Sequence, residues 1–165
     1  SHSFSDVAKK VVSIINLASV AAIQDMVGRP VDPLRFRGNI YVEGWPPWRE
    51  FELLGQEVAI GEQARAKVIK RIARCAATNV EPATGIRDLD IPNTLLRLLG
   101  HGDCGVYAEA VAGGTISVGD AVCLSDPAFG EGSAGHVSKH TTPAYPSVRS
   151  PNTARHEEAP APDGD

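Results

Sequence analysis

Cys75 is the residue of this 165-residue sequence whose type and surroundings best suit chemistry. An alternating apolar run ends at the pair Arg74-Cys75, and a polar stretch containing Pro82 and Gly85 follows. This pattern predicts a thiol at the end of a strand, beside a fixed positive charge. Such a thiol loses its proton more readily and can bind a soft metal or carry sulfur. The alternative is inert packing, because a free cysteine is among the most often buried residues.

Three further segments combine polar residues with glycine at short spacings. Arg35-Phe36-Arg37-Gly38-Asn39 precedes the cysteine, and His-Gly-Asp-Cys-Gly-Val-Tyr-Ala follows it over residues 101–108. The run Gly-Thr-Ile-Ser-Val-Gly-Asp then occupies residues 114–120. An arginine fork suits phosphate or carbonyl oxygens, and an asparagine amide both donates and accepts.

These segments, in this order, resemble the MOSC domain. That domain is shared by the C-terminal part of molybdenum cofactor sulfurases and by the mitochondrial amidoxime-reducing proteins. The resemblance runs from about Val12 to Leu124 and implies a small β-barrel that holds a molybdenum cofactor (molybdopterin). In the amidoxime-reducing relatives the cysteine of the Arg-Cys motif ligates molybdenum, which implies that Cys75 is both the metal ligand and the catalytic residue.

The same resemblance implies the cofactor-binding residues. Arg37 and Asn39 match an Arg-x-Asn element that lies at the cofactor, although an arginine and an asparagine after a proline-rich turn also often anchor backbone. Ser19 matches a small hydroxyl residue at a helix start, where anions bind readily, and a plain helix cap is the alternative. The remaining candidates for the cofactor pocket are Arg35, Arg74, Thr78 and Asn79.

The sequence leaves three functions open. The first is a molybdenum-cofactor-binding domain of an oxidoreductase that reduces N-hydroxylated compounds, with electrons from a flavin or iron–sulfur partner protein. The second is a sulfur carrier that uses a Cys75 persulfide, supplied by a cysteine-desulfurase-type donor. Any pyridoxal phosphate would then belong to that separate partner. The third is a non-catalytic β-barrel interaction module, in which Cys75 is buried.

Two other groups of residues have open roles. His101 and Asp103 resemble an acid/base or metal pair, but residues of this kind more often cap the start of a hairpin. Trp45 and Trp48 form either a rim over a substrate pocket or a lid on the core edge.

Composition limits the classes of partner and the compartment that we expect for this protein. The net charge of −4 disfavours nucleic acid as the main partner, and no apolar run is long enough to span a bilayer. The cysteines Cys75, Cys104 and Cys123 have no C-x-x-C spacing, which disfavours a disulfide framework and indicates a reducing cytoplasm. The chain begins at Ser1 without Met, and larger relatives carry a further N-terminal half. We therefore expect the C-terminal part of a larger protein.

The elements that must position these residues are mostly short strands. Apolar β-branched or alternating runs predict strands at residues 11–15, 39–42, 57–60, 64–72 and 106–111, with a last meander over 116–124. Helices are expected over residues 17–27 and from residue 93 or 94 to 99, closed by Gly28 and Gly100. The fold class is therefore mainly β with short helices (α+β), a small barrel over residues 1–124. Residues 125–165 are rich in Pro and Ala, which predicts a disordered tail.

Overall fold

The strands of the protein close into a barrel in the computed structural model, which describes residues 10–125 and 134–141. In chain order the elements are β1 (Val11–Asn16), α1 (Leu17–Val27), the 3-10 turn η1 (Pro33–Phe36), β2 (Ile40–Glu43), α2 (Arg49–Glu52), β3 (Glu57–Ile60), β4 (Ala64–Ala73), the 3-10 turn η2 (Ala76–Asn79), α3 (Ile91–Leu99), β5 (Asp103–Ala112), β6 (Ala121–Leu124) and β7 (Gly135–Val137). This mainly β barrel with few short helices is the fold class that the strand pattern predicts.

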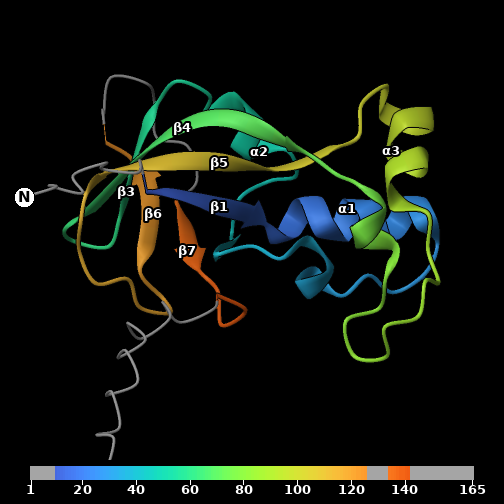
Figure 1. Ribbon diagram of the computed structural model, residues 1–165. Coiled ribbons are helices and arrows are strands. Elements are labelled where there is room, and N and C mark those ends of the chain that lie inside the picture. The colour runs from blue at the N-terminus through green and yellow to red at the C-terminus, as the bar shows by residue number, and fades with distance from the viewer. Residues whose placement is uncertain (1–9, 126–133, 142–165) are drawn as a thin grey trace, which may run out of the picture.

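Around the barrel the strands follow the order β1-β2-β7-β6-β3-β4-β5, and β5 closes the ring against β1. The pair β1–β2 is parallel, and α1 makes the crossover between these strands. The other pairs are antiparallel. Helices α1 and α3 lie together at one end of the barrel, where the long strands β4 and β5 lead (Figure 1). That end of the molecule therefore holds the segments that flank Cys75.

Alternation along the strands divides the core in two. Ile14 and Val42 belong to a cluster that draws on all the strands, so it fills the barrel. Their neighbours Ile15 and Tyr41 point the other way and pack with Val20, Ile23, Ile91 and Leu95 of α1 and α3. Because successive strand side chains point to opposite faces, neighbouring residues of one strand contribute to different clusters.

The helix ends follow local chemistry. The side chain of Asn16 accepts a hydrogen bond from the Ala18 N–H at 3.1 Å, which caps α1. Gly28 ends α1 and Gly100 ends α3, each in the left-handed region that glycine adopts without strain. Both expected helices are confirmed, and α3 begins at Ile91, slightly earlier than predicted.

The structure departs from the sequence interpretation in three places. Strand β7 lies beyond the expected end of the barrel at Leu124 and inserts between β2 and β6. The rest of the expected tail, residues 126–133 and 142–165, lies outside the described residues. Ile116 and Val118 precede β6 rather than forming a strand, and α2 was not expected.

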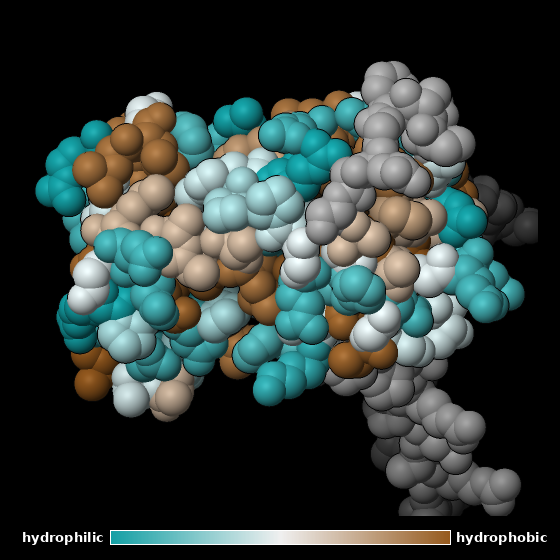
Figure 2. All heavy atoms as spheres, turned by 180° about the vertical axis from the view of Figure 1, so that it is seen from behind, coloured by the Kyte–Doolittle hydropathy of each residue, from teal (hydrophilic) through white to brown (hydrophobic). Residues whose placement is uncertain are grey.

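The surface between these elements is mixed. On the face opposite that of Figure 1, apolar residues form separate groups among polar ones (Figure 2). Leu96 and Leu98 of α3 are among the exposed large apolar side chains. Within the described residues, no helix has the length and apolar character needed to cross a membrane.

Candidate molybdenum-cofactor site

Cys75 is an exposed free thiol, as the strand-end pattern predicts. It lies two residues beyond the end of β4 and keeps an extended backbone, with φ −109° and ψ 177°, before the chain turns into η2. Its carbonyl oxygen accepts hydrogen bonds from the Thr78 N–H at 3.1 Å and from the Thr78 hydroxyl at 2.9 Å. Thr78, which is buried, therefore holds the turn beneath the thiol and does not line an open pocket.

The other two cysteines have different environments. Cys104 is fully buried, and burial raises the pKa of its thiol strongly, so it stays protonated. Cys123 of β6 is exposed. The chain therefore offers two exposed thiols, one beside the predicted site and one on another strand of the barrel.

Arg74 turns its guanidinium inward, away from the outer side of the strand. Its Nε donates to the Cys104 carbonyl at 2.7 Å and its Nη1 to the Phe36 carbonyl at 2.9 Å. Burial lowers the pKa of this guanidinium. The third nitrogen, Nη2, is buried and has no hydrogen-bond partner in the part of the chain that the structure describes. Arg74 thus ties the ends of β4 and β5 to η1, so the Arg74-Cys75 segment contacts the segment that carries Arg35 and Arg37.

Arg37 and Asn39 are both exposed, directly after the carbonyl that Arg74 holds. Arg37 adopts a left-handed backbone with φ 49°, which is uncommon for a residue other than glycine. The Asn39 Oδ1 accepts the Ser13 N–H at 2.8 Å and the Ser13 hydroxyl at 2.9 Å. Asn39 therefore anchors β2 to β1, the predicted alternative role, and its Nδ2 amide group remains at the surface.

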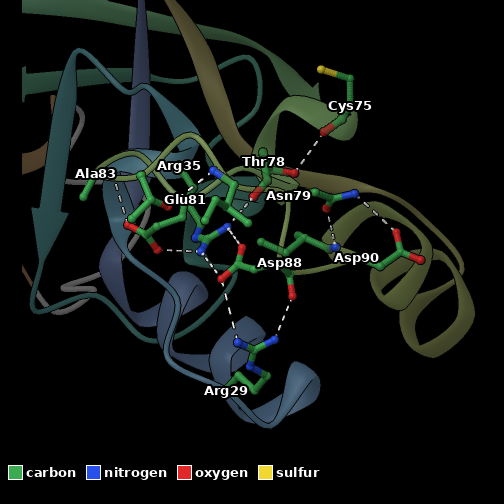
Figure 3. Close-up of polar contacts among 12 residues, drawn as sticks. Arg29, Arg35, Cys75, Thr78, Asn79, Glu81, Ala83, Asp88 and Asp90 are labelled. Atoms are coloured by element: carbon green, nitrogen blue, oxygen red, sulfur yellow. Dashed lines mark hydrogen bonds and ion pairs between the residues drawn. The ribbon is translucent and has the colours of Figure 1, made fainter.

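Arg35 is buried and already has carboxylate partners, which argues against its predicted contact with the cofactor. Its Nη2 lies 2.7 Å from Glu81 and 2.9 Å from Asp88, and its Nη1 lies 2.8 Å from the second oxygen of Asp88 (Figure 3). Burial alone would lower the pKa of Arg35, but the hydrogen bonds and charges of Asp88 and Glu81 outweigh it and raise that pKa. The hydrogen bond from Arg35 likewise lowers the pKa of Asp88.

The ion pairs of the buried Arg35 with these two partly exposed carboxylates tie η1 to the loop that follows η2. Asn79, the last residue of η2, ties the far end of that loop back to η2, because its Oδ1 accepts the Ile91 N–H at 2.7 Å and its carbonyl accepts the Asp88 N–H at 3.0 Å. Asn79 is itself buried. In Figure 3 the sulfur of Cys75 points away from this network. Arg35, Thr78 and Asn79 thus support the site from beneath.

Ser19 belongs to a separate buried polar cluster and does not face solvent. Its hydroxyl donates to Glu50 Oε2 at 3.0 Å and accepts the Trp48 N–H at 2.8 Å. The Asn16 Nδ2 donates to the same Glu50 oxygen at 2.9 Å and to the Pro46 carbonyl at 2.8 Å. Asn16, not Ser19, caps the helix, so Ser19 fits neither its predicted cofactor contact nor its predicted capping role.

Sequence reasoning missed three members of these networks: Glu50, Glu81 and Asp88. Each is an acidic residue in a short or aperiodic segment, which is typical of a solvated surface. The only local signal was the density of small polar residues in the 79–90 loop, which is rich in groups able to accept from a buried arginine.

The barrel, the exposed thiol at the end of β4 and the bracing arginine define a β-barrel protein with a thiol site at one strand end. In comparison with known proteins, the family model of the MOSC domain matches residues 1–123. The chain therefore belongs to the MOSC domain family. No curated protein matches the sequence.

Proposed function

We propose that this chain binds the molybdenum cofactor and that Cys75 is the protein ligand of molybdenum. The observation that carries the proposal is the exposed Cys75 thiol at the end of β4 in a MOSC barrel. A thiolate is a soft ligand and suits a soft, sulfur-rich metal centre. The MOSC family is associated with this cofactor, which supports the assignment.

The exposed polar residues of the segment that Arg74 ties to the end of β4 fit an anionic, oxygen-rich cofactor. Arg37 and the Asn39 amide group present exposed donors, and the buried Arg74 Nη2 is a donor that has no hydrogen-bond partner among the described residues. In this assignment Arg37 and Asn39 hold the cofactor, whereas Arg74 positions the strand end that carries Cys75. The other four predicted residues do not contact the cofactor in this assignment and only hold the supporting segments in place: Arg35, Ser19, Thr78 and Asn79.

The finer proposal is reduction of N-hydroxylated compounds by an oxidoreductase of which this chain is part. Two electrons and two protons convert an N–OH group into N–H and water, so the N–O bond breaks and the oxygen leaves as water. The bound cofactor would supply the two-electron chemistry. The electrons come from a separate flavin or iron–sulfur protein.

The test of cofactor binding uses the two exposed thiols as a matched pair. The protein and its Cys75→Ser and Cys123→Ser variants are expressed in a host that makes the cofactor, and molybdenum and pterin are determined per chain. We expect molybdenum in the unaltered protein and in Cys123→Ser but not in Cys75→Ser. Equal molybdenum in both variants, or none in any of the three proteins, contradicts the proposal. Amidoxime reduction with a chemical electron donor then tests the finer assignment.

Exposure of Cys75 also favours a second candidate, the sulfur carrier. Here the sulfane sulfur of a donor persulfide is transferred to the Cys75 thiolate, which forms a Cys75 persulfide and releases the donor thiol. Cyanide-labile sulfur on Cys75 in molybdenum-free protein would support this candidate. The third candidate, an inert interaction module, predicted a buried Cys75, and the exposed thiol shows that expectation to be wrong.

A further inference from the structure

Cys75 shares one face of the β4–β5 ribbon with a group of side chains that the proposed site does not use. Ile72 and Arg74 point toward the cluster beneath α1 and α3. Since side chains alternate along a strand, Arg71, Ala73 and Cys75 lie on the opposite face. Where β4 ends and β5 begins, the Arg74 N–H donates to the Gly102 carbonyl at 2.8 Å. Cys75 is the next residue after Arg74, and His101 is the residue just before Gly102.

Three rings gather on this face. Trp48 and Phe51 are stacked with centroids 5.7 Å apart. The His101 ring stands edge-on to both of them, at 6.3 Å from Trp48 and 5.7 Å from Phe51. All three are only partly buried. The Arg71 guanidinium lies 4.2 Å from the Phe51 centroid and joins this group to the strand that ends at Cys75.

The structure holds Trp48 in place at a local cost. Trp48 has φ 66°, a left-handed conformation that bulky residues rarely adopt. Its N–H is held by the buried Ser19 hydroxyl, which in turn donates to the buried Glu50 carboxylate. The His101 ring is fixed as well, because its Nδ1 accepts the Asp103 N–H at 3.1 Å. Strained positions that the surroundings maintain are typical of binding sites.

We propose that Trp48, Phe51 and His101 form an aromatic platform that binds a planar ring of the substrate beside Cys75. Aromatic rings prefer offset-stacked and edge-to-face partners, and this group presents both kinds of surface while partly exposed. The inference rests on the proposed function, since it names the class of N-hydroxylated compound that the site would favour: one whose N–OH group is attached to an aromatic ring system. The Arg71 guanidinium lies over the Phe51 ring and adds a cation to this group.

The test needs no molybdenum and compares two amides of similar size, planar benzamide and puckered cyclohexanecarboxamide. Iodoacetamide alkylates the full chain, and mass spectrometry follows Cys75 and Cys123 separately in the same sample. We expect benzamide to slow alkylation of Cys75 and not of Cys123. Its half-protecting concentration should be about two- to tenfold lower than that of cyclohexanecarboxamide, the range expected for one aromatic pair.

Variants then assign the effect to the platform. Trp48→Leu and, independently, Phe51→Leu should bring the two amides to equal half-protecting concentrations. Val118→Ala, which removes exposed apolar surface before β6, should change nothing. Equal protection of Cys75 by both amides in the unaltered protein overturns the proposal. So does equal protection of Cys123, or a preference for benzamide that survives in both folded platform variants.

The outcome is separable from that of the proposed function. Protection of Cys75 without molybdenum binding in the metal assay would retain the platform and remove the cofactor. Molybdenum binding without selective protection would do the reverse.

Discussion

Glu50 offers the sharpest test of what stabilises the segments around the candidate site, because its carboxyl is fully buried and faces uncharged donors. Asn16 and Ser19 donate to its Oε2, and Oε1 has no hydrogen-bond partner within residues 10–125 and 134–141. Burial raises the pKa of Glu50, and its hydrogen bonds offset that shift only in part. The folded protein therefore binds this proton more tightly than the unfolded chain does.

The sign of the pH dependence follows. An acid whose folded pKa is raised contributes its full stability below the unfolded pKa, near 4.5. That contribution is lost as the pH rises through the folded pKa, at up to about 1.4 kcal/mol per pH unit within the window. Glu50→Gln imitates the protonated acid, so its free energy of unfolding should not fall over the same window. We expect the difference between variant and unaltered protein to grow as the pH rises above about 4.5.

The Glu50→Leu variant measures how much the Glu50 carboxylate contributes to stability as a hydrogen-bond acceptor. The Asn16 amide keeps its bond to the Pro46 carbonyl but loses one acceptor, and the Ser19 hydroxyl loses the Glu50 carboxylate to which it donates. Two buried donors left unsatisfied, at about 1–2 kcal/mol each, predict a loss of roughly 2–4 kcal/mol.

Urea unfolding followed by circular dichroism at several pH values, with a constant m value, measures both variants. If Glu50→Leu lowers the free energy of unfolding by less than about 1 kcal/mol, the hydrogen bonds of the buried polar cluster do not stabilise the contact between α1 and α2. Parallel pH profiles for Glu50→Gln and the unaltered protein would refute the raised pKa.

Three further predictions concern the rest of the frame. Arg35→Met should lower the free energy of unfolding by roughly 2–3 kcal/mol, a moderate loss because the partly exposed carboxylate partners of Arg35 can regain water. The variant should also lack the part of the stability that the protein loses as the pH falls through the lowered pKa of Asp88. Urea melts between pH 3 and pH 7 check both expectations. Gly105→Ala should destabilise by more than about 2 kcal/mol, since φ is +77° and a Cβ would lie 2.6 Å from a side-chain carbon and 2.8 Å from a backbone oxygen. Gly28→Ala, at φ +69° with open space around it, is the matched control and should cost about 1 kcal/mol in the same melts. Cys75→Ser should leave the melting curve within about 0.5 kcal/mol of the original, because the thiol is exposed, and a larger loss would mean that it packs.

The barrel was predictable because its strands alternate and its turns carry glycine. The exposed position of Cys75 followed from the same logic, since a polar turn replaces the apolar run at that residue. Periodicity reports which side of a strand a residue occupies, so it served well for β1 and for the β3–β4 hairpin.

The orientation of the arginines could not be predicted in this way. Arg35 and Arg37 are two residues apart, yet η1 and the left-handed turn at Arg37 send one inward and the other outward. The acidic partners of Arg35 come from a loop with no period, 46 and 53 residues further along the chain. A charged residue in such a loop is usually solvated, and only tertiary contact shows otherwise.

The position of β7 has a consequence for any fragment of this protein. Residues 135–137 pair with both β2 and β6, although the family match ends at residue 123. A chain cut after Leu124 would leave the backbone N–H and C=O groups of two strand edges open to other molecules. Such edges recruit strands from neighbouring chains, so a version shortened to the matched region should self-associate, whereas one that retains Val137 keeps the ring sealed.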